Sequence, residues 1–426
     1  MEAEEVMRMF AVVAILFVSA AAPVTAQMGR HKTFSFGSEK KNANYTQVVS
    51  STVYDKSKGF GFEPGAEMNC GVNGCSSAKP FYFSTAVREG NYYVTVKFGD
   101  EKNATSTVVK AELRRLMIER VDTKPGEFVS RNFAVNVRTP VISTGGEVKL
   151  KDRERTSEQW AWDEKLTLEF NGTRPSIASI KIEPVSSWTV FLLGDSTVCD
   201  QPGEPYASWG QMITRFFGKK VAVANHAESG ESLKSSLGAR RLDKVLSQMK
   251  LGDYLLIQYG HNDEKEKGEG IGAFTSYKTS LKQFVDAAKK KGGIPILITP
   301  MHRRTFNANG KITNSHGDYP EAVRQVAQEG NVALIDLHAM SKDLYEALGS
   351  EGSGVLFKEG DGTHHNAYGA YQLAKSIVQS ISDQRLPLAK FLLKDLPKYD
   401  PKHPDALATF SIPASPAVTN LKPLGS

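Results

Sequence analysis

The chain has 426 residues, of which 40% are hydrophobic and 23% are charged. That balance supports a sizeable core divided among two or three domains, and it excludes a globally disordered chain. The 53 basic and 47 acidic side chains give a net charge of +6, and three cysteines are too few for a small scaffold held together by disulfides.

The first segment of the chain is apolar and short. Residues 10–24 (FAVVAILFVSAAAPV) fall below the about 20 residues that a membrane-spanning helix needs, and no longer apolar run follows. VTA before Gln27 is typical of a signal-peptide cleavage site, so we expect residues 1–26 to be removed. The protein would then be secreted or periplasmic, with no integral membrane segment in the mature chain. The acidic start MEAEE argues against this unless translation begins at Met7, and an uncleaved anchor or a disordered tail is the alternative.

Residues 31–185 have the pattern of an all-β domain. Four segments alternate polar and apolar side chains: 91–99, 106–114, 131–139 and 165–172. A period of two is the signature of half-buried strands, and Gly, Asn, Asp and Pro separate these segments. We therefore predict an antiparallel β-sandwich over residues 31–185. Within it, Cys70 and Cys75 could form a disulfide or remain two buried thiols, and Cys199 would be left unpaired.

The pattern changes near residue 186, where continuous apolar runs begin to alternate with helical stretches. The runs are 189–194, 221–225, 254–260, 294–300 and 332–337. The helical stretches are 207–217, 240–249, 274–291, 319–329 and 366–381. Strands that are apolar throughout are buried on both faces, so we predict an α/β domain over residues 188–385 with a doubly wound, five-stranded parallel sheet. Such sheets bind ligands at the carboxyl ends of their strands. Residues 386–426 would form a C-terminal arm or linker.

Polar residues follow two of the predicted strands. Ser196, in GDST after the first strand, would lie on a tight turn beside backbone N–H groups, which suits a serine nucleophile. Asn262, in GHND after the third strand, could aim its amide N–H groups into the crevice where an oxyanion forms. Taken alone, each segment favours a structural role instead: a helix N-cap at Asp195 or Ser196, and an Asx turn at Asn262.

Two further loops carry residues that suit the same chemistry. Gly230, in NHAESGES after the second strand, would let the backbone approach a substrate and supply an N–H, although loop glycines are common. Asp361 and His364 could lie side by side before the last helix, so that the imidazole takes the proton from a serine. A helix N-terminus with surface histidines and a metal site are the alternatives. The remaining histidines lack ligand-like spacing, which disfavours a metal.

The order Ser, Gly, Asn and Asp-x-x-His resembles the SGNH (GDSL-type) hydrolase superfamily, and most closely its rhamnogalacturonan acetylesterases. The matching strings are FLLGDSTVCD, SWGQM, NHAESGES, IQYGHND, ITPMHRR and DGTHHNAYGAYQLA. The resemblance implies a flavodoxin-like sheet and an ester hydrolase that needs neither metal nor cofactor. It implies that Ser196 is the nucleophile, that His364 is the general base and then the general acid, and that Asp361 orients His364. It also implies an oxyanion hole formed by the backbone N–H groups of Ser196 and Gly230 and the side chain of Asn262.

Two positions bear on the site residues that this resemblance implies. His365 competes with His364 for the role of base, but the D-x-x-H spacing selects His364. Relatives often carry Arg where this chain has Glu231, which puts the polar contacts with substrate in doubt rather than the catalysis.

The predicted partner is an acetylated plant cell-wall polysaccharide, with rhamnogalacturonan first. No long apolar segment near the site indicates a lipase-like lid, which favours a short acyl group. Candidate substrate contacts are Trp209, His261, Arg303 and Arg304. Trp209 could stack on a sugar ring, and arginine suits a uronic-acid carboxylate. A core position for Trp209 and a solvated basic turn at the arginines are the alternatives. Removal of residues 1–26 would raise the net charge to +8, which mildly favours an acidic polysaccharide; no basic-aromatic motif indicates nucleic acid.

The sequence is also consistent with two other functions. One is an SGNH esterase that acts on other acetylated carbohydrates or short-chain esters, and the other is a non-catalytic carbohydrate-binding protein. Segments 34–37 and 54–65 resemble galactose-binding-like modules. The first domain could therefore bind sugar, through exposed aromatic residues such as Tyr82, or only support the catalytic domain.

Overall fold

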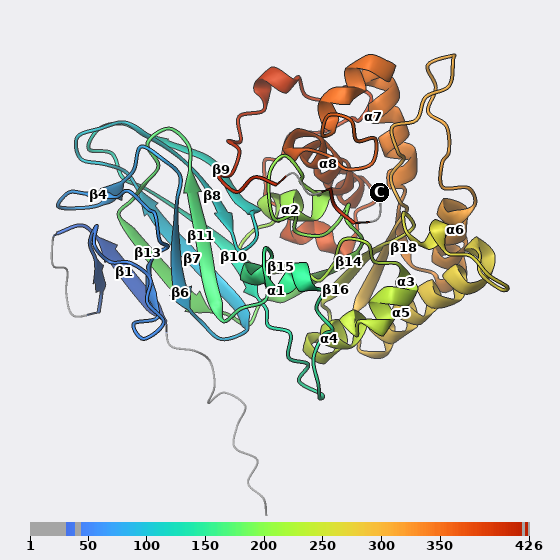
Figure 1. The fold of residues 1–426 in the computed structure, drawn as a ribbon, viewed down its shortest axis with the longest axis horizontal. Helices are drawn as coiled ribbons and strands as arrows, with labels where there is room; N and C mark the ends of the chain where they lie inside the picture. Colours follow the sequence, from blue (N-terminus) through green and yellow to red (C-terminus); the bar gives the residue numbers. More distant parts are fainter. Residues whose placement is uncertain (1–30, 39–43, 420–421, 425–426) are drawn as a thin grey trace, which may run out of the picture.

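The chain folds into two halves that lie side by side (Figure 1). The computed structural model describes residues 31–38, 44–419 and 422–424, so the predicted signal peptide at residues 1–26 lies outside the described residues. Sheets that are antiparallel except for one pair of strands make up the first half, and a parallel sheet with helices makes up the second, as the sequence predicts. Within the described ranges, no helix is both long and apolar enough to cross a bilayer.

The first half is a sandwich of two five-stranded sheets. Its strands are β1 (Lys32–Phe36), β2 (Thr46–Val48), β3 (Phe60–Phe62), β6 (Phe81–Ala86), β7 (Gly90–Phe98), β8 (Thr105–Ala111), β9 (Arg115–Thr123), β10 (Val129–Val137), β11 (Lys165–Asn171) and β13 (Ser179–Pro184). One sheet has the order β10–β7–β13–β1–β2 and the other β3–β6–β11–β8–β9. Alternate side chains of β7, including Val94 and Val96, are buried in a core that they share with Phe83 and Leu168 of the other sheet. This alternation is the period-two pattern of the sequence.

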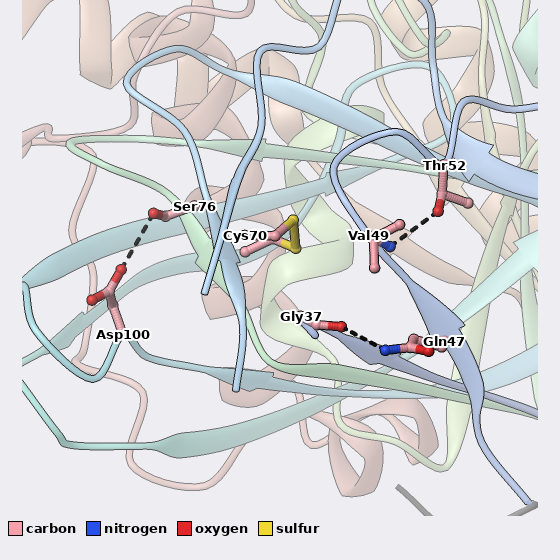
Figure 2. Close-up of a disulfide and its surroundings, with 8 residues drawn as sticks. Gly37, Gln47, Val49, Thr52, Cys70, Ser76 and Asp100 are labelled. Carbon is pink, nitrogen blue, oxygen red and sulfur yellow. Dashed lines mark hydrogen bonds between the residues drawn. A yellow bond between two sulfur atoms is a disulfide. The ribbon is translucent and has the colours of Figure 1, made fainter. Parts of the chain in front are cut away.

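A small third sheet holds the disulfide. It consists of β4 (Asn69–Cys70), β5 (Cys75–Ser76) and β12 (Ser176–Ile177). Cys70 and Cys75 face each other across β4 and β5 and are joined by a disulfide bond (Figure 2). Of the two possibilities that the sequence left open, the disulfide is therefore the one that forms. Cys199 is a buried free thiol.

The second half contains the predicted five-stranded parallel sheet. Its strands are β14 (Trp188–Gly194), β15 (Val221–Asn225), β16 (Tyr254–Gln258), β17 (Ile294–Ile298) and β18 (Ala333–Ile335). Their order, β15–β14–β16–β17–β18, is that of flavodoxin-like folds, and every pair is parallel. Ligands bind such sheets where the strand order reverses, which here is beside the carboxyl end of β14.

Helices cover both faces of this sheet. They are α2 (Trp209–Ile213), α3 (Leu233–Gly238), α4 (Arg241–Gln248), α5 (Lys278–Lys290), α6 (Tyr319–Gly330), α7 (Leu337–Gly352) and α8 (Ala367–Asp383). Val190 and Leu192 of β14 pack in one core with α2, α7 and α8, whereas Phe191 and Leu193 pack in the other with α3 to α6. Burial on both faces explains why the strand is apolar throughout.

Buried polar contacts join the two halves. Arg115 of β9 donates from Nη1 to the backbone oxygen of Val223 in β15, at 3.0 Å. A one-turn helix of the first half, α1 (Asp152–Arg155), carries Glu154, whose carboxylate pairs with Arg241 of α4. Because these contacts are shielded from water, they fix the two halves relative to each other.

The C-terminal arm after α8 returns to the junction between the halves (Figure 1, red). Lys110 of β8 donates to the backbone oxygen of Pro413 at 3.0 Å, and Thr419 N donates to the oxygen of Glu204 at 2.8 Å. The arm therefore contacts both halves.

Candidate active site

Ser196 lies on a tight turn directly after β14. The turn is held by Asp195, whose Oδ1 accepts hydrogen bonds from Thr197 N at 2.9 Å and from Thr197 Oγ1 at 2.7 Å. Gly194 is required before it, because a Cβ there would lie 2.5 Å from Val198 Cγ2. The next helix, α2, begins only at Trp209, so this turn is not a helix cap, and the N-cap alternative is excluded.

His364 is hydrogen-bonded to Ser196 and to Asp361. Its Nε2 lies 2.9 Å from Ser196 Oγ, and its Nδ1 lies 2.9 Å from Asp361 Oδ2. A carboxylate only accepts hydrogen bonds, so Nδ1 carries the proton and Nε2 is free to accept from the serine hydroxyl. Ser196 and His364 are 168 residues apart in the sequence, yet they lie in one hydrogen-bonded series with Asp361. This is the arrangement that a nucleophilic serine needs.

Asp361 is held in its ionised form. Burial alone would raise its pKa, but the side chain of His364 and the backbone N–H groups of Thr363 and His364 all donate to the carboxylate. These donors outweigh burial and hold the pKa of Asp361 well below its ordinary value.

His365 lies in a different environment. Its Nε2 is 2.8 Å from the hydroxyl of Tyr345 on α7, and its ring packs against Phe357 with centroids 4.3 Å apart. Burial lowers the pKa of His365 to about 3, so the ring is neutral. The geometry therefore places His364, and not its neighbour, on Ser196.

Gly230 and Asn262 lie on adjoining loops at the same edge of the sheet. Asn262 Nδ2 donates to the backbone oxygen of Glu231 at 3.0 Å, which ties the loop after β16 to the loop after β15. An amide nitrogen has a second N–H, which this bond does not use. Gly230 has a φ of +78°, a left-handed conformation that favours glycine.

Residues 422–424 of the C-terminal arm lie next to these groups. Lys422 Nζ lies 3.9 Å from Asp361 Oδ2. A Cβ built on Gly230 would come within 2.9 Å of Leu424 Cβ. Ser196 and His364 are only 1% and 2% exposed, so a substrate has to enter a closely packed site.

Two of the candidate substrate contacts are buried side chains. Trp209 is only 1% exposed, and its Nε1 donates to Gln258 Oε1 at 2.8 Å within the core, so its proposed stacking on sugar rings is corrected. His261 is also fully buried, with Nδ1 3.3 Å from Asp195 Oδ2. Burial lowers its pKa to about 4. His261 therefore lies against the turn that carries Ser196 and has no exposed surface with which to contact a substrate.

The two arginines are engaged within the protein. Arg303 forms an ion pair with Glu264 at 2.5 Å and donates to the backbone oxygen of His261 at 3.2 Å. Arg304 donates from Nε to Ser353 Oγ at 3.0 Å. These contacts occupy both side chains, but only the charge of Arg303 is paired with a carboxylate among the described residues.

The sequence reasoning overlooked several residues that hold the site together. Gln201 Nε2 donates to the backbone oxygen of Ser196 at 2.6 Å, and Lys151 reaches the loop of Gly230 from the first half. Neither lies in a recognisable motif. Gln201 follows Ser196 by five residues, but glutamine in a loop is not specific for such a contact, and Lys151 lies 78 residues from its partner Ser229. In the part of the chain that the structure describes, no group of three or more His, Cys, Asp or Glu side chains could hold a metal ion.

The fold and the site together define a class of enzyme. A serine, a histidine and an aspartate in hydrogen-bonded series at the carboxyl edge of a parallel sheet are the parts of a serine hydrolase. The GDSL-like Lipase/Acylhydrolase family matches residues 192–371, and the chain belongs to this family. It is accordingly an esterase of the SGNH type.

Relatives of this chain include both characterised and uncharacterized esterases. Rhamnogalacturonan acetylesterase RhgT of Bacillus subtilis is 40% identical over 219 residues, which are 48% of this chain and 94% of RhgT. The probable rhamnogalacturonan acetylesterase YesY of the same bacterium is 35% identical over 48% of this chain and 98% of YesY. The uncharacterized esterase YxiM, also from Bacillus subtilis, is 28% identical over 82% of this chain and 90% of its own length. The crystal structure of YxiM covers 84% of this chain and 99% of its own, with 26% identity and a TM-score of 0.46.

Proposed function

We propose that this esterase removes acetyl groups from a plant cell-wall polysaccharide, with acetylated rhamnogalacturonan as the first candidate. The observation that carries the proposal is the series Asp361–His364–Ser196 in a catalytic half that is 40% identical to RhgT. That similarity extends over 94% of RhgT.

Acylation starts at the serine hydroxyl. His364 Nε2 accepts the proton while Ser196 Oγ attacks the carbonyl carbon of the acetyl ester. Asp361 stays ionised and holds Nδ1–H, which stabilises the imidazolium that forms. The developing oxyanion is received by the N–H groups of Ser196 and Gly230 and by Asn262 Nδ2, and each donor lowers the barrier by about 2.7–4 kcal/mol.

Acylation ends when the imidazolium of His364 gives its proton to the departing oxygen of the sugar, which leaves an acetyl-serine at Ser196. Deacylation uses the same groups again. A water molecule then loses a proton to His364 and attacks the acetyl carbon. Acetate leaves, and the serine regains its proton from the imidazolium.

We also infer that the protein is exported, to the periplasm or beyond the cell. The apolar segment 10–24 and the small residues up to Ala26 support this, as does the disulfide between Cys70 and Cys75, since disulfides persist in oxidising compartments. A polymeric wall substrate is also found outside the cytoplasm. Protein recovered from outside the cytoplasm should begin at Gln27, whereas an intact N-terminus would contradict cleavage.

The substrate is tested by acetate release from acetylated rhamnogalacturonan, acetylated xylan and long-chain esters. We expect the highest kcat/KM on rhamnogalacturonan, and we expect Ser196→Ala to lower kcat by at least about 10⁴-fold. Ser130→Ala, an exposed serine of the first half, is the matched control and should retain wild-type activity. A preference for xylan would move the assignment to another carbohydrate ester, and a preference for long acyl chains would refute an acetylesterase. If the wild type failed to hydrolyse even p-nitrophenyl acetate, a non-catalytic carbohydrate-binding protein would be favoured.

A further inference from the structure

Lys151 connects the first half of the molecule to the proposed oxyanion hole. It precedes α1 in the connection between β10 and β11, so it belongs to the half that carries the sandwich. Its Nζ donates to the backbone oxygen of Ser229 at 2.5 Å and lies 2.9 Å from Glu231 Oε1. Since these two residues flank Gly230, the ammonium group lies beside the glycine whose N–H the mechanism uses.

The contact with the Ser229 oxygen acts on the N–H of Gly230, because both belong to one peptide group. A peptide is planar and trans, so its C=O and N–H point in opposite directions. A donor that fixes the C=O therefore fixes the direction of the N–H. A charged donor also polarises the peptide, and in a poorly solvated site this makes the N–H a stronger hydrogen-bond donor.

The backbone of Lys151 is held by the buried ion pair between Glu154 and Arg241. Its backbone N–H donates to Glu154 Oε2 at 2.9 Å. The carboxylate of Glu154 accepts from both terminal nitrogens of Arg241 on α4, at 3.0 and 2.6 Å, and neither side chain is exposed. A bidentate pair of this kind has a defined geometry. The backbone of Lys151 is thereby fixed against the catalytic half.

Glu231 completes the arrangement on the other side of Gly230. Its side chain is 1% exposed and faces Lys151 and also Arg241, whose Nε lies 3.6 Å away. Its backbone oxygen accepts from Asn262 Nδ2. The acidic residue, found where the resemblance leads us to expect arginine, thus balances the charge of Lys151 and adjoins two predicted oxyanion donors.

We propose that Lys151 is a positioning residue for the oxyanion hole, and that through it the first half completes the esterase site. Its ammonium holds and polarises the peptide between Ser229 and Gly230. This inference rests on the proposed function, because it requires the N–H of Gly230 to receive the oxyanion. An interaction that matters only when the oxyanion forms changes kcat and leaves KM almost unaltered.

The test compares three substitutions at Lys151 with one at Lys149. Lys151→Met removes charge and donor, Lys151→Gln keeps a neutral donor, and Lys151→Arg keeps a charged donor. Lys149→Met is the matched control, because Lys149 is exposed two residues earlier and holds the catalytic half through its backbone N–H, which bonds to Ala239. All are assayed on p-nitrophenyl acetate, and folding is checked by circular dichroism and Tm.

We expect kcat to fall by about 10- to 100-fold in Lys151→Met, less than the loss when a whole oxyanion donor is deleted, with KM within about twofold of wild type. The value of kcat should be highest in Lys151→Arg, lower in Lys151→Gln and lowest in Lys151→Met. If Lys151→Met does not fold, the comparison of Lys151→Arg with Lys151→Gln tests the proposal, since kcat should be several-fold higher in Lys151→Arg. The proposal would be overturned by equal kcat values in Lys151→Arg and Lys151→Gln or by an effect on KM alone. A kcat in Lys151→Met equal to that of Lys149→Met would also overturn it.

Ser196→Ala separates this inference from the function on which it rests. If Ser196→Ala is inactive while every Lys151 variant behaves like the control, only the role of Lys151 fails. If Ser196→Ala is as active as the wild type, the proposed function itself fails.

Discussion

The substitution Asp361→Asn tests the imidazole tautomer that the structure assigns. Oδ1 of Asp361 accepts from the backbone N–H groups of Thr363 and His364 at 2.8 and 3.0 Å, while Oδ2 accepts from His364 Nδ1. In the variant, the amide oxygen must face the two backbone donors, because an NH₂ group there would oppose them. The NH₂ group then faces Nδ1 and forces it to accept. The proton moves to Nε2, so the imidazole can no longer accept the proton of Ser196.

We expect this change to lower kcat by about four orders of magnitude, or about 5.4 kcal/mol, the size found where the same change imposes the wrong tautomer on another serine hydrolase. The fold should persist because Asn has the shape of Asp. Initial rates on p-nitrophenyl acetate and the Tm are the measurements, and Asp286→Asn, at an exposed position of α5, is the control. A folded Asp361→Asn protein that kept more than about a tenth of the wild-type kcat would refute the tautomer assignment.

Four other predictions concern the same site. His364→Ala should lose at least about 10⁴-fold in kcat, whereas His365→Ala should keep most of its kcat and lose Tm; the opposite result would reverse the two roles. Asn262→Ala should lose about 10²- to 10³-fold in kcat with little change in KM, and an unaltered kcat would remove it from the oxyanion hole. The pKa of His365 is lowered to about 3, so its contribution to stability is complete above its ordinary pKa of 6.5 and is lost as the pH falls towards 3. In urea denaturation, the stability advantage of the wild type over His365→Gln should therefore shrink by about 1.4 kcal/mol per pH unit below about pH 6, and a constant difference would contradict a neutral buried ring. Replacing Lys422 and Leu424 together by Ala should lower KM for polymeric substrate and leave kcat on p-nitrophenyl acetate unchanged; a raised KM would show instead that the arm helps to bind substrate.

The parallel sheet could be predicted well because its signal is local. The run 221–225 coincides with β15, and the other four runs overlap β14, β16, β17 and β18, since burial on both faces demands apolar residues throughout. The sequence does not predict helix α7, because its amphipathic pattern is weak and the chain is kinked at Gly349, where φ is +77°.

Elements whose stability depends on distant partners left no such signal. Strand β9 begins with Arg115, a residue that argues against burial, yet the side chain is 1% exposed because it donates to the backbone oxygens of Val223 and Asn136. Lys151 lies in a polar connection with no motif, and its partner Ser229 is 78 residues away.

The residues of the candidate active site could be predicted only through the combination of motifs. Ser196 and His364 were chosen because four segments occur in a known order, and the structure brings these two into contact. Predictions that rest on the chemical type of a side chain alone agree less well with the structure. Trp209 has an aromatic ring suited to sugar, but the sequence does not show that its indole N–H bonds to Gln258 inside the core. Tyr82, proposed as an exposed platform, packs against Trp160 with ring centroids 5.0 Å apart.

Covalent labelling tests the central chemistry most directly. A fluorophosphonate that reacts with activated serines is added to the wild type, Ser196→Ala and His364→Ala, and the modified peptide is identified by mass spectrometry. A hydroxyl activated by the imidazole 2.9 Å away should give one adduct, on Ser196, that is absent from Ser196→Ala and forms far more slowly in His364→Ala. An adduct on a different serine that persists in Ser196→Ala, or labelling of Ser196 at an undiminished rate without His364, would contradict the account.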